Sequence, residues 1–506
     1  RAAVQEVLRL AVGALACAAC LLALWPLASS AASAADLEES ATSSSAVELE
    51  ESTSAEVGSA FLGLPGVGRG TGQRALRAAM ARYCRAAPAG SEGSAPLGPE
   101  GGESFELVQV QILHRHGQRS AIHSMSGARA NFSCALSEDR RHMLARWPAR
   151  FEVASAQAQG GVLRREWGPE VEADGRTCKP GQLTDEGFRQ LHDMGSQLRV
   201  AYDNLLPNLT TGLQAEEVYA RTTDYQRTRA STAALLDALL GPGAGERPAP
   251  WRIRILAHED KGQEPMLGTG LQRQFFGTNE AAADASATPV PESPCPRATR
   301  LAARQHEAFR PEKGLRENLA RALGEGVRRQ TATQIADALY SAGCEGDALP
   351  CADRCISAAV AVRALDDADR HFCSRYTGRE GGAEATRLAF QPVLQEVVDR
   401  LMAAAAAATG GLAGGAAPKL VVLGGHDTVV APVAAALGFY ADCNWPSLAS
   451  RIVFELWRSS PRDRSGAEGG VGEAPPPPLV GVRILLNGRL VTSAVPGCRG
   501  ASKRGV

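Results

Sequence analysis

The feature that most constrains the fold is a recurring one: a short apolar strand pattern ends in a polar, glycine-containing turn and a helical pattern follows. The run FELVQVQIL at 105–113 leads directly into R-H-G-Q-R at 115–119. The buried-strand pattern KLVVL at 419–423 ends in G-G-H-D at 424–427, and a helix is expected at 428–437. Strands that alternate with helices in this way are typical of an α/β sheet.

Further patterns extend this arrangement on both sides of a helical stretch. EVYAR at 217–221 predicts a strand followed by a helix, and Thr184 is a suitable N-cap for a helix that continues to about Tyr202. Between about 262 and 410 the pattern is mostly helical. We therefore expect an α/β fold over residues 105–500, with a central mixed β-sheet flanked by helices and an inserted helical cap. The other expected strands are 253–257, 451–457 and 480–486, and a tight hairpin turn is expected at Asn487-Gly488.

The N-terminal segment has a different character. No charged residue occurs from Leu10 to Ala35, whereas Arg1 and Arg9 precede this stretch. It fits a signal peptide, cut after a small-residue run such as Ala-Ser-Ala at 32–34, or a single membrane anchor with the arginines on the cytosolic side. A buried core helix fits poorly beside the polar sequence that follows. We favour the anchor for residues 1–35. Whether this segment is an anchor or a signal peptide, the rest of the protein is expected to lie outside the cytosol.

Residues 36–104 are expected to form a disordered stem. The part from 36 to 60 carries seven acidic residues and no basic one, and Gly- and Pro-containing sequence continues to about 102. Such a composition buries too little apolar surface to fold alone.

Over the whole chain, 54 basic and 55 acidic side chains nearly cancel, so no charge excess points to nucleic acid. An anionic substrate would have to be bound by a local group of arginines.

The cysteines and glycosylation signals agree with an oxidising compartment. Ten of the twelve cysteines lie outside the N-terminal apolar segment, and disulfides are their expected state. The group Cys344, Cys351 and Cys355 could instead be read as metal ligands, but it lacks a C-x-x-C pair or a histidine at zinc spacing. Sequons at Asn131 and Asn208 are consistent with a luminal protein. The ten are Cys84, Cys134, Cys178, Cys295, Cys344, Cys351, Cys355, Cys373, Cys443 and Cys498.

The R-H-G-Q-R run at the end of the first strand has the composition of a phosphate-transfer site. Phosphoryl transfer requires several cations around one nucleophile, and the planar guanidinium group can grip two phosphate oxygens at once. Arg115 and Arg119 flank His116, and we expect Gly117 to leave room for the phosphate to approach. An isolated sequence of this kind would be read as a solvated basic turn.

Two further pieces at strand ends strengthen the catalytic interpretation. D-Y-Q-R-T at 224–228 follows the EVYAR strand and places Arg227 at a helix start, and Asp427 and His426 follow the 419–423 strand. Asp427 is a candidate general acid and His426 a candidate hydrogen-bond donor to phosphate. His114 is expected to pack in the core or on the surface without a catalytic role.

In this order, R-H-G-x-R at 115–119, D-x-x-R-T at 224–228 and G-H-D-T at 425–428 resemble the histidine acid phosphatase branch of the histidine phosphatase superfamily. The resemblance covers about 105 to 495. It implies a phosphoglycerate-mutase-like core and a phosphomonoesterase that needs no metal or organic cofactor. His116 would form a phosphohistidine and Asp427 would protonate the leaving group. The phosphate pocket would consist of Arg115, Arg119, Arg227 and His426.

Within this family, the chain is similar to the phosphatases of the Golgi that act on phosphorylated xylose in the glycosaminoglycan linkage region. The similarity rests on the N-terminal segment, the stem, the Tyr83-Cys84 pair, and the sequences at 451–457 and 482–488. It implies a phosphorylated glycan or small-molecule substrate and a single-pass type II membrane protein of the Golgi, or a secreted protein. The family usually has a proline soon after R-H-G-x-R where this chain has Ser120-Ala121, which bears on substrate choice.

The sequence is therefore consistent with three functions. The first is a phosphatase of the secretory pathway that acts on a phosphorylated glycan. The second is a general acid phosphatase or phytase. The third is an inactive member that binds a phosphorylated ligand, although such a member would be expected to lose the nucleophile or the acid, and this chain has both His116 and Asp427.

Overall fold

The computed structural model describes residues 71–95, 104–125, 132–157, 161–206, 213–241, 252–260, 264–268, 295–346, 349, 351, 355–410, 417–459, 478–496 and 498. The expected anchor or signal peptide at 1–35 and both sequon asparagines, Asn131 and Asn208, lie outside these residues. In the part of the chain that is described, no helix is both long enough and apolar enough to cross a bilayer.

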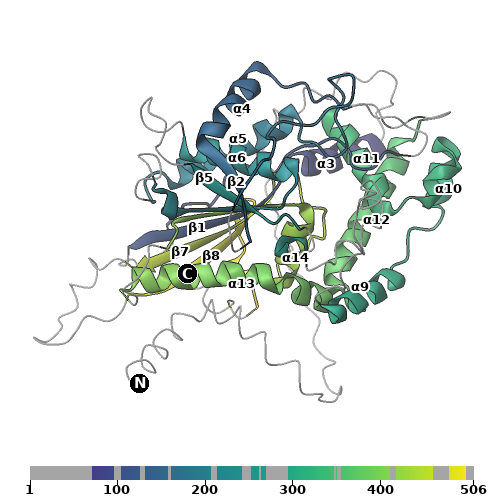
Figure 1. Ribbon diagram of the computed structural model, residues 1–506. Helices are drawn as coiled ribbons and strands as arrows, with labels where there is room; N and C mark the ends of the chain where they lie inside the picture. The colour runs from purple at the N-terminus through teal and green to yellow at the C-terminus, as the bar shows by residue number, and fades with distance from the viewer. Residues whose placement is uncertain are drawn as a thin grey trace, which may run out of the picture.

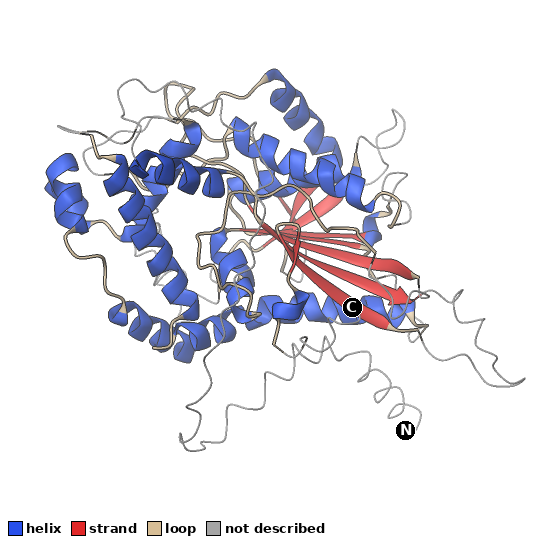
Figure 2. Ribbon diagram, turned by 180° about the vertical axis from the view of Figure 1, so that it is seen from behind, coloured by secondary structure: helices blue, strands red, loops and turns tan. Residues whose placement is uncertain are grey.

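The described residues form one nine-stranded mixed sheet with helices on both faces, as expected (Figures 1 and 2). The strand order is β3-β2-β5-β4-β6-β1-β7-β8-β9. The central strands β2, β5, β4, β6 and β1 are parallel, whereas β3 at one side and β7, β8 and β9 at the other run antiparallel to their neighbours. Their bounds are β1 Phe105–Arg115, β2 Phe151–Ser155, β3 Val162–Leu163, β4 Val218–Thr222, β5 Ile253–Ala257, β6 Leu420–Gly425, β7 Arg451–Ser459, β8 Val480–Leu486 and β9 Arg489–Leu490.

Helices cover the sheet in two layers and extend beyond it as a cap. In Figure 1, α4, α5 and α6 lie on one face of the sheet, α13 and α14 lie on the other, and α3 and α9 to α12 form the cap. The bounds are α3 Thr71–Cys84, α4 Glu138–Arg150, α5 Asp185–Tyr202, α6 Gln226–Leu240, α9 Pro296–Ala308, α10 Leu315–Leu323, α11 Ala332–Glu345, α12 Ala358–Thr377, α13 Gly382–Ala408 and α14 Asp427–Ala436.

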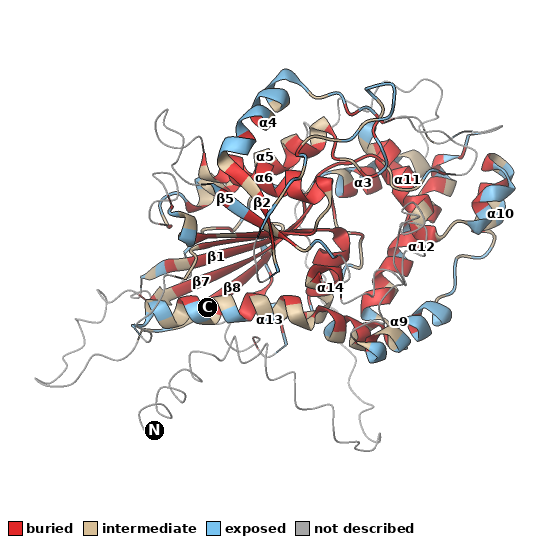
Figure 3. Ribbon diagram, viewed as in Figure 1, coloured by how far each residue is buried: buried red, intermediate tan, exposed pale blue. Residues whose placement is uncertain are grey.

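Side-chain alternation along β1 explains why both faces need cover. Val110 and Ile112 pack into the core beneath α5 and α6, whereas Leu113 belongs to the second core, which continues into α13, α14 and the cap. Figure 3 shows the strands buried and the outward faces of α4 and α10 exposed. Strands buried on both faces are typical of parallel sheets.

The predicted helix at 184–202 is confirmed. The structure has α5 at Asp185–Tyr202, and the Thr184 side chain accepts a hydrogen bond from the backbone N–H of Gly187, as an N-cap does. The apolar face chosen from the 3.6-residue period is buried against the sheet and α6. Its members are Phe188, Leu191, Met194 and Leu198.

The expectation of a disordered stem up to residue 104 is wrong for residues 71–95. Thr71–Cys84 forms α3, and Leu76, Met80 and Tyr83 on it are buried in the cap. The segment after α3 is bound to the sheet, because Glu92 pairs with Arg451 on β7 at 2.6 Å. The buried positions of α3, which are Leu76, Ala79, Met80 and Tyr83, have the spacing of an amphipathic helix, and the composition of the surrounding sequence masked this pattern.

Disulfides are the observed state of eight of the ten cysteines expected to form them. The described bonds are Cys84–Cys344, Cys134–Cys178, Cys351–Cys355 and Cys373–Cys443. Cys344 and Cys351 therefore have different partners, which contradicts the metal-site reading of the group 344–355.

Candidate active site

The parallel order of β4, β6 and β1 brings the three sequence motifs to one edge of the sheet. Arg115 at the end of β1 is in register with Gly425 at the end of β6, and Thr222 of β4 is in register with Gly424. The residues that follow each strand therefore meet around one pocket. Its lining is His116, Arg119, Ile122, His123, Tyr225, Arg227, Thr333, Asp337, His426, Asp427, Thr428 and Trp445.

His116 is held as a neutral ring with one defined free nitrogen. Its Nδ1 lies 2.8 Å from the carbonyl oxygen of Gly117, and because a carbonyl only accepts, Nδ1 must carry the proton. Burial, followed by the nearby charges of Arg115, Arg227 and Arg119, holds the pKa of His116 well below its usual range. The lone pair on Nε2 is therefore available to a phosphorus atom at neutral and mildly acidic pH.

Gly117 has a different role from the one expected. A Cβ at this position would lie 2.3 Å from the carbonyl oxygen of Gly187, and a Cβ on Gly187 would lie 2.1 Å from the oxygen of Gln118. Both distances are impossible for real side chains. Glycine is required because the phosphate loop packs directly against the first turn of α5.

Arg119 is oriented by an acidic residue from the cap. Its Nη2 donates to Oδ1 of Asp337 on α11 at 2.7 Å, and Oδ2 of Asp337 accepts the backbone N–H groups of Ile122 and His123. Burial raises the pKa of Asp337, but Arg119 and His123 outweigh this effect and the pKa is lowered overall. Sequence reasoning missed Asp337, because it lies 218 residues from its partner in a helical block without a recognisable motif.

Arg115 and Arg119 each have a buried Nε that makes no hydrogen bond to the described residues. The terminal nitrogens of Arg115 contact the carbonyl of Pro446, the hydroxyl of Tyr83 and Asp427, and those of Arg119 contact the carbonyl of Ser120 and Asp337. A buried donor such as these Nε atoms is costly unless a ligand accepts from it. Arg115 itself does not line the pocket but lies behind Asp427.

Arg227 reaches the pocket from the start of α6. Its guanidinium lies 4.4 Å from the centre of the Tyr225 ring, and its Nη1 is 3.4 Å from the carbonyl oxygen of Gly181. Asp224, the first residue of the same motif, pairs instead with Arg165 and Arg229 and so fixes the turn between β4 and α6. The segment thus supplies Tyr225 and Arg227 to the pocket and Asp224 to its support.

His426 and Asp427 begin α14 on the other side of His116. The rings of His116 and His426 are nearly perpendicular with centres 5.4 Å apart, and Nε2 of His426 lies 2.9 Å from the hydroxyl of Thr223. Oδ2 of Asp427 accepts from Nε1 of Trp445 at 2.8 Å and contacts Nη2 of Arg115 at 2.7 Å. Trp445 was not predicted, since no motif surrounds it.

His114 packs beneath the site, as expected. It is fully buried, and its ring nitrogens contact the carbonyl of Arg115 and the hydroxyl of Thr232. Burial lowers the pKa of His114 to about 4.

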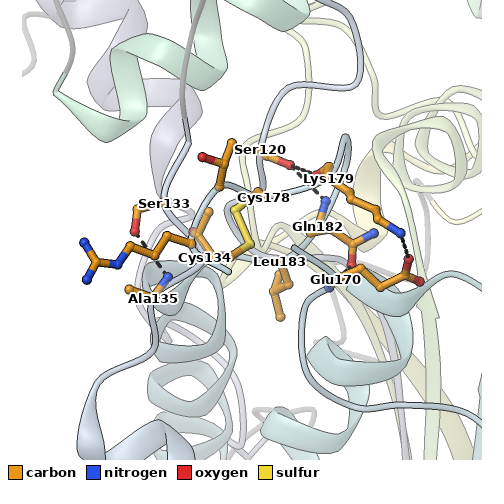
Figure 4. The surroundings of a disulfide bond; sticks show 12 residues. Ser120, Ser133, Cys134, Ala135, Glu170, Cys178, Lys179, Gln182 and Leu183 are labelled. Atoms are coloured by element: carbon orange, nitrogen blue, oxygen red, sulfur yellow. Dashed lines mark hydrogen bonds and ion pairs between the residues drawn. A yellow bond between two sulfur atoms is a disulfide. The ribbon is translucent and has the colours of Figure 1, made fainter. Parts of the chain in front are cut away.

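The loop beyond Arg119 is bound to a disulfide-tethered segment. The hydroxyl of Ser120 donates to the carbonyl of Lys179 at 2.8 Å and accepts the backbone N–H of Gln182 at 3.0 Å. Figure 4 shows these residues beside the Cys134–Cys178 disulfide. Gly181, whose carbonyl faces Arg227, belongs to the same segment. Ser120 therefore lies behind the pocket lining and connects it to the segment that contacts Arg227.

None of the described residues form a group of three or more His, Cys, Asp or Glu side chains that could hold a metal ion. The pocket lining includes Arg119, Arg227, His116 and His426. Such an arrangement can bind a tetrahedral oxyanion and present a nucleophile to it.

Comparisons with known proteins agree with this geometry. Residues 106–466 match the histidine phosphatase superfamily (branch 2). The chain is 25% identical over 424 residues to 2-phosphoxylose phosphatase 1 of Danio rerio, covering 79% of this chain and 76% of the relative. It is 26% identical over 303 residues to the testicular acid phosphatase of Mus musculus, covering 57% and 62%.

Solved structures with a similar outline include a phytase of Hafnia alvei in complex with tartrate, at 16% identity and a TM-score of 0.41, covering 77% of this chain and 85% of the phytase. A multiple inositol polyphosphate phosphatase of Bifidobacterium longum gives 11% identity and a TM-score of 0.42, covering 81% and 92%. On the family match, which spans more than half of the sequence, the chain belongs to branch 2 of the histidine phosphatase superfamily and is a phosphoric monoester hydrolase.

Proposed function

We propose that the protein hydrolyses phosphate monoesters in two steps through a phosphohistidine on His116. Nε2 of His116 attacks phosphorus, the bond from phosphorus to the leaving oxygen breaks, and Asp427 gives that oxygen a proton. Water then attacks the phosphohistidine, Asp427 takes its proton, and the P–N bond breaks to restore neutral His116. Inorganic phosphate and an alcohol are the products.

The observation that carries this proposal is the environment of His116. Its Nδ1–H is bound to the Gly117 carbonyl, and its pKa is held well below the usual range, so the attacking nitrogen is unprotonated. Arg119, Arg227 and His426 surround the same pocket and would hold the phosphate oxygens. Arg115 would act from behind the pocket, where its Nη2 holds Asp427.

The pocket supports a substrate with one phosphate on a neutral, hydroxyl-bearing leaving group. Among its described lining residues, the only permanently charged cations are Arg119 and Arg227. The rest of the wall consists of Ile122, His123, Tyr225, Thr333, Asp337, Thr428 and Trp445 together with the catalytic side chains. A polyphosphorylated ring would bring further negative charges toward Asp337, and the described lining has no third permanent cation to receive them. This favours a sugar phosphate over an inositol polyphosphate.

The proposed identity of the substrate is supported by the names of the relatives. A phosphorylated xylose in a glycosaminoglycan linkage region has one phosphate on a neutral sugar, and relatives of this chain are named 2-phosphoxylose phosphatase. We propose this substrate class for the secretory pathway, in a Golgi type II membrane protein or a secreted form. The four disulfides support an oxidising compartment.

A phosphate-release screen tests the proposal. The substrates are phosphorylated xylosides, other sugar phosphates, inositol hexakisphosphate and an aryl phosphate, each with the wild type and with His116→Ala. Protein denatured rapidly at alkaline pH, where the P–N bond survives, should carry phosphate on His116 in the wild type only. Equal release by both proteins would contradict the mechanism, and turnover of inositol phosphates alone would contradict the sugar assignment. Binding without any release would identify an inactive member.

A further inference from the structure

Two helices outside the sheet hold the phosphate loop from behind. Tyr83 on α3 accepts a hydrogen bond from Nη2 of Arg115 at 2.7 Å. On α11, Glu345 accepts from Nε2 of Gln118 at 2.8 Å and Asp337 accepts from Arg119 at 2.7 Å. Three residues of the R-H-G-Q-R run are therefore held by α3 and α11.

The same two helices are joined covalently at this point. The disulfide Cys84–Cys344 links the end of α3 to the end of α11. Tyr83 precedes one of its cysteines, and Glu345 follows the other. The ring of Tyr83 also stacks on that of Tyr340, with centres 3.8 Å apart and an angle of 12° between the planes. The positions of the contacts to Arg115 and Gln118 are thus fixed relative to each other.

Tyr83 reaches the reacting groups through one intermediate. The Nη2 atom of Arg115 that donates to the Tyr83 hydroxyl also contacts Oδ2 of Asp427 at 2.7 Å. Arg115 is fully buried, and its guanidinium lies 4.8 Å from the centre of the Tyr83 ring. Removing the hydroxyl would release one side of this guanidinium and allow it to shift, and the carboxyl group of Asp427 would shift with it.

We infer that Tyr83, fixed by the Cys84–Cys344 disulfide, is a positioning residue for the general acid Asp427 and acts on it through Arg115. This inference rests on the proposed function, because it requires Asp427 to protonate the leaving group. It assigns a catalytic purpose to the helix that precedes the first strand.

The test uses the dependence of the rate on the leaving group. For Tyr83→Phe, kcat/KM on an alkyl or sugar phosphate should fall roughly 10- to 100-fold, as expected for loss of a hydrogen bond to a charged group. On p-nitrophenyl phosphate it should fall less than about threefold, because that leaving group departs without a proton. Inhibition by inorganic phosphate should be unchanged, since Tyr83 does not line the phosphate pocket.

Tyr202→Phe is the matched control. Tyr202 is also fully buried and donates to a charged partner, Glu455, at 2.8 Å, but it lies in the core away from the pocket. It should lose stability without any selectivity between the two substrates. Equal losses on both substrates for Tyr83→Phe, or no loss on either, would overturn the inference.

The double variant Cys84→Ser/Cys344→Ser provides a second readout. At temperatures where its circular dichroism matches that of the wild type, it should show the same selective loss on alkyl phosphates. An equal loss on alkyl phosphates and on p-nitrophenyl phosphate would show that the disulfide contributes to stability alone. It would contradict a role of the disulfide in positioning Tyr83. Activity in His116→Ala would instead contradict the proposed function, so the two failures are distinguishable.

Discussion

The phosphate loop has two sides, and they differ in origin and in task. On one side, the carboxyl ends of β1, β4 and β6 supply His116, Arg227, His426 and Asp427, all within short motifs. On the other side, α3 and α11 supply Tyr83 and Asp337, which are bound to the loop's arginines. In the proposed mechanism, residues of the sheet edge would contact the phosphate, and residues of the helices would hold those side chains in place.

This difference implies two kinds of mutational effect. Removing a sheet-edge residue should mainly remove a chemical step or a contact to phosphate, and in the case of Asp427 it should also lower stability, because Asp427 pairs with the buried Arg115. Removing a residue of α3 or α11 should have a smaller effect on the rate and a larger effect on stability, because its partner is a buried charge that loses its neutralising group.

The largest effect is expected for Asp427→Asn. The amide cannot donate the proton that the carboxyl group supplies, so kcat/KM on a sugar phosphate should fall by about 10³-fold, within the range typical of general acids. The loss on p-nitrophenyl phosphate should be much smaller, and the melting temperature should fall, because the buried Arg115 loses its negative partner. Equal losses on the two substrates would mean that Asp427 acts on the phosphate and not on the leaving group.

Arg227→Lys should lower kcat/KM roughly 10- to 100-fold on every substrate, because the ammonium group lacks the two-pronged grip on phosphate oxygens. Inhibition by inorganic phosphate should weaken in parallel. Arg229→Lys, two residues later on α6, is the control: Arg229 pairs with Asp224 outside the pocket lining, and phosphate inhibition should be retained. The same weakening in both variants would contradict a direct contact between Arg227 and phosphate.

Asp337→Asn tests how α11 supports Arg119. The amide leaves Arg119 buried without a negative partner, and the free energy of unfolding should fall by about 3 kcal/mol in urea titrations. We expect a rise in KM of roughly tenfold, because Arg119 loses its orientation, with a smaller change in kcat. A loss of kcat as large as that of Asp427→Asn would move Asp337 from a supporting to a catalytic role.

The smallest effect concerns His114 and pH. Its pKa is about 4 in the folded protein and near 6.5 in an unfolded chain, so the unfolded state binds the extra proton as the pH falls. The stabilising contribution of neutral His114 is present above pH 6.5 and is lost toward pH 4. Between pH 7 and pH 5 the wild type should lose about 2 kcal/mol more stability than His114→Gln. Parallel stability curves for the two proteins would contradict the low pKa.

The accuracy of sequence reasoning followed the range of the interactions involved. The helix at 184–202 was predicted because its N-cap and its apolar face are both local patterns, and both were confirmed. The stem boundary was wrong because it was drawn from composition, which hid the helical spacing of Leu76, Met80 and Tyr83. Partners far along the chain also hold α3, such as Asp369, which pairs with Arg82 across 287 residues. Gly117 was assigned to phosphate access, whereas the structure shows its contact with Gly187, which no local pattern reveals.

By itself, the sequence determined the alternation of strands and helices, the three motifs at strand ends, and the disulfide-forming character of the cysteines. These depend on periodicity, on turn residues and on redox chemistry, all of which act over short stretches of chain. The tertiary structure alone decided that Tyr83 and Asp337 hold Arg115 and Arg119, and that Trp445 donates to Asp427. A buried charge can take its partner from any segment that packs beside it, and packing is set by the whole fold.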